Sequence, residues 1–114
     1  MTPSFTYRAK FRSNWDGDTV RLDIDLGFGS WIHNQSVRLL DIDAPALRGE
    51  TLEEARESKE FLQGLLENAE DIVIQTRKSE DDDKYGRWLA YIWADGTLVN
   101  QEMIDEGHAT CYRA

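Results

Sequence analysis

Alternating apolar and polar positions dominate the first forty residues of the chain. Residues 5–11 and 20–26 each place an apolar side chain at every second position, which is typical of strands with one buried face. The run GFGS before Trp31 supplies the glycines of a turn, and residues 36–42 form a more continuously apolar segment that Pro45 ends. The pattern therefore predicts three strands that meander through the first forty-five or so residues.

One longer stretch has helical spacing instead. Thr51 and Glu54 match a capping box. After them, apolar residues recur at roughly helical spacing among Glu and Lys, at Leu52, Ala55, Leu62, Leu65, Leu66 and Ala69. Residues 72–77 and 88–94 are predicted to be two further strands, the second followed by the tight-turn pair Asp95-Gly96. Residues 100–106, closed by Gly107, predict a short second helix.

Five strands with a helix between the third and the fourth predict a small fold of known type. The order favours a five-stranded Greek-key barrel of the oligonucleotide-binding (OB) kind, an α+β fold dominated by β structure. The sequence has neither an internal repeat nor a linker, so we expect one domain over residues 1–114. Because this barrel is a scaffold for many binding functions, the fold alone does not specify an activity.

Composition limits the partners that the chain can attract. Its 114 residues include 13 Lys and Arg against 22 Asp and Glu, a formal net charge of −9. Such a chain does not attract phosphate backbones at long range, so a polyanionic substrate would need help from a cation. The one cysteine, Cys111, excludes an intrachain disulfide and is expected to be a buried thiol.

The beginning of the chain does not resemble a targeting segment. MTPSFTYRAKF alternates polar and apolar residues where a signal peptide needs a continuous apolar stretch, and no later segment approaches the length of a membrane span. We therefore expect the printed chain to be the mature one and expect no membrane partner. We also expect the protein to be a monomer, and we favour the cytoplasm as its compartment.

Three short clusters carry the candidate chemistry: DGDTV at 16–20, VRLLDIDAP at 37–45 and KYGR at 84–87. Taken singly, each has an ordinary structural interpretation. Asp16 and Asp18 flank a glycine before a strand, as in a turn that caps the strand. Asp43, before Ala-Pro, is equally well explained as a solvated loop residue.

The arginines of these clusters leave two interpretations open. Arg38 lies inside an apolar strand, where an unpaired guanidinium is costly to bury. It must therefore pair with Asp41 or Asp18, or face a phosphate. Arg87 stands at the head of an aromatic strand, where it either pairs with the acidic run 80–83 or takes the same phosphate-binding role.

In combination, the clusters resemble a known family. DGDTVRLDIDLG, VRLLDIDAP and DDDKYGRWLAYIWADGTLVNQEMIDEGHA are similar, in order and spacing, to the staphylococcal nuclease (thermonuclease-like) family over about residues 5–112. The third block is the most specific of the three. The resemblance implies a calcium-dependent phosphodiesterase that hydrolyses DNA and RNA, with its active site at one side of the barrel.

By matching position, the resemblance also implies a metal site. Asp18 and Asp43 match carboxylates that ligate Ca²⁺, and the backbone carbonyl of Ala44 takes the third protein ligand position. Asp16 matches an acidic residue that supports the site without necessarily touching the metal. Hard oxygen ligands suit Ca²⁺, and waters and a substrate phosphate would complete its shell.

The resemblance further implies how the substrate is held. Arg38 and Arg87 match two arginines that grip the scissile phosphate, where guanidinium contacts counter the charge of the transition state. Lys84 and Tyr85 match groups that bind the neighbouring terminal phosphate. Tyr112 lies near the position of tyrosines that stack on the base.

One departure from the family pattern bears on activity. After DAP the family usually has a glutamate that acts as general base or orients the attacking water, and this chain has Ala46. General-base assistance is typically worth about 10²–10⁴ in rate, so the sequence predicts a weakened nuclease. The alternative is a non-catalytic module that binds nucleic acid or a protein partner. Ala46 and the negative charge favour the module. The presence of both carboxylates that match metal ligands, together with both arginines, favours the enzyme.

The remaining aromatic and imidazole side chains have simpler interpretations. Trp31, Trp88 and Trp93 are predicted to lie in the core or the barrel wall, with base stacking as the alternative. For Trp15, next to the proposed metal loop, the choice stays open. His33 and His108 have no companion at metal-ligand spacing and are interpreted as ordinary polar residues.

Overall fold

The predicted strands and helices form in the computed structural model, which describes residues 5–45, 49–76 and 87–111. In chain order the elements are β1 (Thr6–Asn14), β2 (Thr19–Gly27), β3 (Ser30–Leu39), β4 (Ile42–Asp43), η1 (Gly49–Thr51), α1 (Leu52–Glu67), β5 (Ile72–Thr76), β6 (Trp88–Ala94), β7 (Thr97–Leu98), α2 (Val99–Asp105) and β8 (Thr110–Cys111). The short element η1 is a single 3₁₀ turn.

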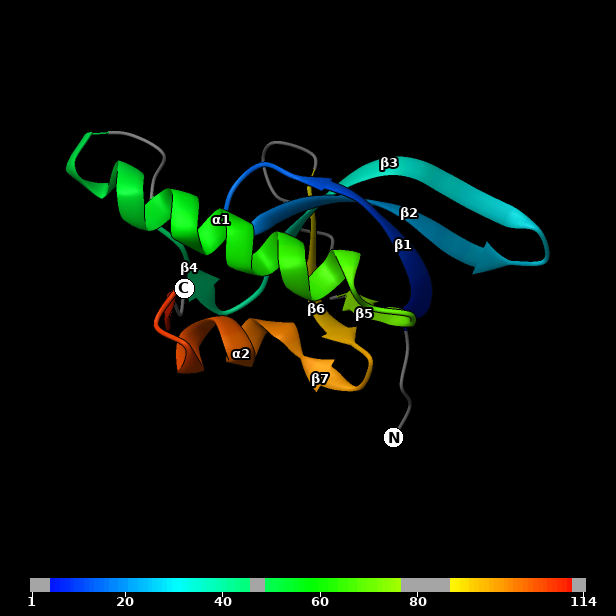
Figure 1. Cartoon of the computed structure of the whole chain (residues 1–114). Coiled ribbons are helices and arrows are strands. Elements are labelled where there is room, and N and C mark those ends of the chain that lie inside the picture. Colours follow the sequence, from blue (N-terminus) through cyan, green and yellow to red (C-terminus); the bar gives the residue numbers. More distant parts are fainter. Residues whose placement is uncertain (1–4, 46–48, 77–86, 112–114) are drawn as a thin grey trace.

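Five of these strands close into a barrel. The sheet order is β3-β2-β1-β5-β6, and a further pairing of β3 with β6 joins its two ends. The closing pair is parallel and the other four pairings are antiparallel. With α1 between the third and fourth barrel strands and the short α2 after β7, this arrangement confirms the predicted OB-type fold (Figure 1).

The alternation in the sequence fills the barrel. Val20, Leu22 and Ile24 on β2 are fully buried, as are Ile74 on β5 and Ile92 on β6. Helix α1 covers the barrel and adds its own buried leucines, Leu62 and Leu66. Burying one such side chain stabilises the fold by about 1.5–3 kcal/mol, so this alternation is the main source of stability.

The third strand differs from its predicted bounds at both ends. It begins at Ser30 instead of Ser36 because β2 and β3 stay paired as far as Gly27 and Ser30. The resulting hairpin extends beyond the rest of the barrel (Figure 1). At the other end the strand stops at Leu39, since Asp41 has a φ of 67° and turns the chain into β4.

The predicted capping box at the start of α1 is wrong. Thr51 is the N-cap residue, but its side chain makes no capping hydrogen bond. A capping residue usually has an extended backbone, whereas Thr51 ends a 3₁₀ turn with φ −94° and ψ 4°. Helix α2 begins at Val99, and the chain leaves it at Gly107 with a φ of 78°. No helix among the described residues is long and apolar enough to cross a membrane.

Two residues that were predicted to be buried, Trp31 and Cys111, are exposed in the structure. Trp88 and Trp93 are half-buried, as expected of the barrel wall, but Trp31 is 36% exposed because it lies on the extended part of the hairpin. Cys111 is exposed as well, since the chain has left the core after Ala109 and pairs only with β4 there.

The buried amide of Asn100 joins three segments of the fold. Its Oδ1 accepts a hydrogen bond from the Ile92 backbone N–H at 2.9 Å. Its Nδ2 donates to the carbonyls of Leu40 at 2.9 Å and Ala90 at 3.2 Å. These bonds tie α2 to β6 and to the end of β3, the strand that carries Arg38.

Asn100→Ala is therefore expected to lower the free energy of unfolding by about 2–4 kcal/mol, because it leaves buried backbone groups without partners. Urea denaturation measures the change. The neighbouring exposed amide, in Gln101→Ala, serves as the control and should change stability by less than about 0.5 kcal/mol. Equal effects of the two substitutions would contradict this role of Asn100.

Candidate active site

The DGD sequence forms a tight loop between β1 and β2. Oδ1 of Asp16 accepts hydrogen bonds from the backbone N–H groups of Asp18 and Thr19, both at 3.0 Å. The Trp15 N–H donates to the Thr19 carbonyl at 2.9 Å. Asp16 thus caps the start of β2, as the structural interpretation of this cluster expected.

Gly17 allows this loop to lie directly against α1. A Cβ atom at this position would come within 1.9 Å of Ser58 Oγ and 2.8 Å of the Ala44 Cβ. The amide of the buried Asn14 adds a second link, because it donates to the carbonyls of Asp16 and Lys59. Packing against the helix and the β4 segment therefore fixes the position of the loop.

Asp18 is nearly buried, and protein groups surround its carboxylate. Oδ2 accepts a hydrogen bond from the Ala44 backbone N–H at 3.0 Å and lies 3.5 Å from Nη2 of Arg38. Oδ1 accepts from the Thr19 hydroxyl at 3.2 Å. The loop before β2 and the segment after β3 consequently meet at this carboxylate.

Arg38 reaches both acidic residues with one nitrogen. Its Nη2 lies 3.4 Å from Asp43 Oδ1 and 3.5 Å from Asp18 Oδ2. The same nitrogen donates to the Ile42 carbonyl, and Nη1 donates to the Leu39 carbonyl, both at 3.2 Å. Two carboxylates from distant parts of the sequence therefore face one point.

This pairing resolves one alternative from the sequence. Asp41, a possible partner of Arg38, accepts a hydrogen bond from the Tyr91 hydroxyl instead. The positive φ of Asp41 turns its side chain away from the position that a continuous strand would give it. Of the two aspartates proposed as ion-pair partners, the one that contacts Arg38 in the structure is Asp18.

Asp16 has a perturbed acidity. Burial, a hydrogen bond with the Asp18 side chain and the charge of Asp18 outweigh the two backbone hydrogen bonds that this carboxyl accepts, and together they raise its pKa from 3.8 to about 6. Because this pKa is raised in the folded state, the stabilising contribution belongs to the protonated carboxyl and is lost as the pH rises through about 6.

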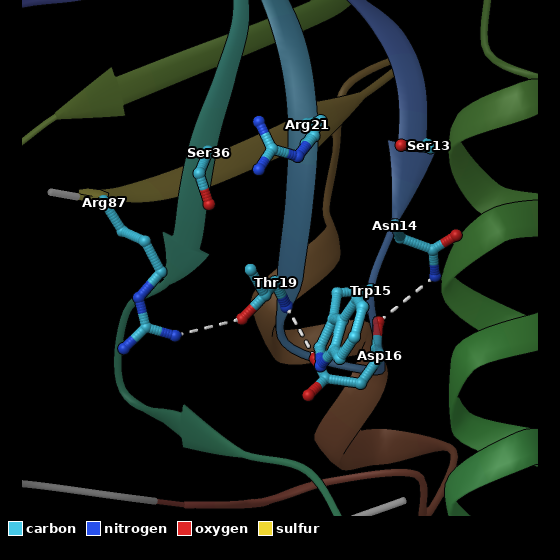
Figure 2. A pocket seen from close by; sticks show the side chains of 8 residues that line it. All are labelled: Ser13, Asn14, Trp15, Asp16, Thr19, Arg21, Ser36 and Arg87. Atoms are coloured by element: carbon cyan, nitrogen blue, oxygen red, sulfur yellow. Dashed lines mark hydrogen bonds between the residues drawn. The ribbon is translucent and has the colours of Figure 1, made fainter. Parts of the chain in front are cut away.

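Arg87 joins the site through Thr19. Its Nη1 donates to Thr19 Oγ1 at 3.3 Å, and that hydroxyl donates to Asp18. Figure 2 shows the Arg87 side chain pointing from the start of β6 toward the beginning of β2. Beside it lies an open pocket of about 410 Å³, lined among others by Trp15, Asp16, Thr19, Arg21, Ser36 and Arg87.

The structure thus connects most of the site residues expected from the sequence. A continuous set of contacts includes Asp16, Asp18, Arg38, Asp43, Ala44 and, through Thr19, Arg87. The other four residues, Ala46, Lys84, Tyr85 and Tyr112, lie outside the described residues. The sequence did not predict that Thr19 links Asp18 to Arg87. The position of Thr19 inside the DGDTV cluster was the one indication that it belongs to the site.

The carboxylate, imidazole and thiol groups of the described residues, those of Asp16, Asp18 and Asp43 included, do not form a metal cluster. Within residues 5–45, 49–76 and 87–111, no group of three or more His, Cys, Asp or Glu side chains is close enough to hold a metal ion. His33 Nδ1 lies 3.4 Å from Asp23 Oδ1 on the hairpin, and the His108 ring stacks on Phe61 with centroids 4.5 Å apart.

Comparison with known proteins yields several relatives. The chain is 33% identical over 107 residues to Protein ParB of Escherichia coli, 31% over 97 residues to a thermonuclease of Staphylococcus hyicus, and 29% over 99 residues to the endonuclease YncB of Bacillus subtilis. These matches cover 86%, 82% and 82% of this chain, and 53%, 53% and 43% of the respective relatives. The chain therefore spans about half the length of the curated relatives it matches.

A family model agrees with the pairwise matches. The model described as "Staphylococcal nuclease homologue" matches residues 36–114. This segment runs from the Arg38 strand through both helices and includes the second and third sequence clusters. Together with the barrel and the relatives, the match shows that the chain belongs to the staphylococcal nuclease homologue family.

Proposed function

We propose that this chain is a calcium-dependent phosphodiesterase that hydrolyses DNA or RNA at a reduced rate. One observation carries the proposal: Arg38 contacts both Asp18 and Asp43, and Thr19 links Asp18 to Arg87. Such a cluster combines oxygen donors for a cation with guanidinium groups for a phosphate. Two relatives bear the names thermonuclease and endonuclease, which favours this function over a non-catalytic module.

The acidic half of the cluster fits a Ca²⁺ site. Asp18 and Asp43 both lie within 3.5 Å of the same Arg38 nitrogen, so their carboxylates are near each other, and the Ala44 backbone is held against Asp18 by a hydrogen bond of 3.0 Å. All the donors are oxygen atoms when the Ala44 carbonyl is included, and Ca²⁺ takes oxygen ligands. We assign these three residues as its protein ligands and Asp16 as the residue that shapes their loop. Bound there, Ca²⁺ would supply positive charge to a substrate phosphate and lower the pKa of a bound water.

The basic half of the cluster fits the phosphate. A guanidinium presents parallel N–H donors that match two phosphate oxygens, so Arg38 and Arg87 are assigned to the scissile phosphate. Their donors would stabilise the charge that develops on its oxygens in the transition state. Lys84 and Tyr85 are assigned to the neighbouring phosphate and Tyr112 to a base, on the resemblance of the sequence clusters alone.

Two features of the chain are expected to limit its activity. Ala46 cannot accept a proton from the attacking water, so the general base is missing. The net charge of −9 repels the substrate, so binding of nucleic acid depends on the divalent cation. We therefore expect slow cleavage that a chelator abolishes.

Calcium and nucleotide are expected to strengthen each other's binding. Because a substrate phosphate completes the metal shell, thymidine 5′-phosphate should raise the Ca²⁺ affinity by about 5- to 150-fold, the usual range for coupled sites. By reciprocity, Ca²⁺ should raise the nucleotide affinity by the same factor. Titration calorimetry measures both.

Asp18→Asn should remove this coupling while keeping an oxygen to accept from Ala44. As the control, Asp71→Asn changes an exposed carboxylate whose partner is Arg8 and should leave both affinities unaltered. Ca²⁺ affinity that ignores the nucleotide, or that persists in Asp18→Asn, would show that the assigned metal site is wrong.

A further inference from the structure

The pocket beside Arg87 extends well past the groups assigned to catalysis. Arg21 on β2 and Ser36 on β3 are paired neighbours in the sheet, and both line it. In Figure 2 these two side chains lie at one end of the pocket, Trp15 and Asp16 lie at the other, and Arg87 reaches in from β6. The pocket therefore begins at a proposed phosphate-binding group and continues along the barrel wall.

The lining suits an anion, although the chain as a whole is acidic. Among the described residues that line the pocket, Arg21 and Arg87 contribute two guanidinium groups and Asp16 contributes one carboxylate. Arg21 is exposed, and its Nη1 donates to the Asn34 carbonyl at 3.1 Å. That bond holds the guanidinium in place and uses one of its five N–H donors. A phosphate next to the scissile one would find a fixed cation here.

Trp15 supplies an aromatic surface at the same place. Its side chain is 72% exposed, whereas Trp88 and Trp93 are half-buried in the barrel wall. So exposed an indole contributes little to the core, and its loop is fixed by the contacts of Gly17 and Asn14 with α1. An exposed tryptophan on a rigid loop is a suitable platform for a nucleobase.

We propose that this pocket binds the nucleotide next to the scissile phosphate of a single-stranded nucleic acid, with its base on Trp15 and its phosphate on Arg21. The volume of about 410 Å³ is within the range of small-ligand sites. A single strand is required because the faces of duplex bases are already stacked. The assignment rests on the proposed function, since it takes Arg87 as the contact to the scissile phosphate.

The test compares binding of a fluorescently labelled, cleavage-resistant trithymidylate to matched variants by anisotropy in Ca²⁺. Trp15→Ala should weaken binding by about 5- to 150-fold, the value of one base stacked on an aromatic ring. Arg21→Ala should lower the slope of log affinity against log salt by about 0.7, the value of one single-strand phosphate contact. Trp31→Ala and Arg8→Ala remove an equally bulky and an equally charged side chain outside the pocket and should change neither quantity.

Oligonucleotides that lack one base locate the stacked nucleotide. Removing the base at one of the three positions should weaken binding to the wild type but not to Trp15→Ala. The reason is that the base removal and the substitution each abolish the same contact, the stacking of that base on the indole. A stable hairpin duplex, whose bases are already stacked, should bind both proteins equally weakly. Equal losses in Trp15→Ala and Trp31→Ala, or a base removal that affects Trp15→Ala as much as the wild type, would overturn the proposal.

Steady-state cleavage separates this inference from the proposed function. Trp15→Ala should raise KM with kcat nearly unchanged, since the indole contacts no reacting atom. If the wild type cuts nothing, the proposed function fails, and the binding comparison still decides whether the pocket holds a nucleotide. If the wild type cuts and Trp15→Ala has an unchanged KM, the pocket assignment alone fails.

Discussion

Ala46→Glu is expected to raise calcium-dependent cleavage of single-stranded DNA by about 10²–10⁴, the usual value of general-base assistance. The reason is the position of residue 46 in the sequence, directly after the segment that brings Asp43 and Ala44 to Arg38 and Asp18. A carboxylate there supplies the proton acceptor that the chain lacks. Initial rates on denatured DNA in Ca²⁺, with a chelator blank, measure the gain.

Ala46→Gln is the matched control for this substitution. It has nearly the size of glutamate but cannot accept the proton, so its rate should stay near that of the wild type. If Ala46→Glu binds Ca²⁺ and nucleotide normally yet cuts no faster than Ala46→Gln, the chain is not a nuclease that merely lacks its base.

Arg87→Ala is expected to lower kcat by about 10²–10³, both in the wild type and in Ala46→Glu. This is the usual loss when one preorganised donor to the transition state is removed. The substitution is informative because, among the residues that the structure describes, the Thr19 hydroxyl is what links Arg87 to the metal side of the site. Its removal should therefore leave Ca²⁺ binding in the absence of nucleotide unchanged, which calorimetry verifies.

Arg87→Lys and Arg8→Ala complete the series. Lysine keeps the charge but lacks the planar fork, so it should recover only a small part of the rate. Arg8, an exposed arginine paired with Asp71, can be removed as a control for net charge without loss of kcat. An unchanged kcat in Arg87→Ala, measured in the faster background, would remove this residue from the catalytic site.

Local sequence pattern predicted most of the barrel because strand alternation is itself the local signature of a half-buried sheet. It failed where long-range pairing decides the outcome. The β2–β3 hairpin continues to Ser30, which exposes Trp31, and no periodicity within those residues reveals how far the partner strand extends. Likewise, the conformation of Thr51 is set by the 3₁₀ turn that it ends, and the capping-box sequence pattern does not predict that turn.

For the candidate site, the sequence identified residue types but not partners. The choice of Asp18 over Asp41 for Arg38 depends on the positive φ of Asp41, a feature of the turn after β3. The contact of Gly17 with Ser58 is equally invisible in sequence, since it joins the loop to a helix forty residues further along the chain. Such contacts determine the geometry of the site, and only the three-dimensional structure reveals them.

Asp18, Asp43, Arg38 and Arg87 are proposed to form one phosphodiester-cleaving site that works with Ca²⁺. The most direct test is the rate at which the purified chain cuts end-labelled single-stranded DNA in Ca²⁺, in chelator, and as Asp18→Asn in Ca²⁺. We expect slow cleavage by the unaltered chain, and we expect both the chelator and the substitution to abolish it. Cleavage that persists in either of those two conditions, or no cleavage by the unaltered chain in Ca²⁺, would contradict the proposal.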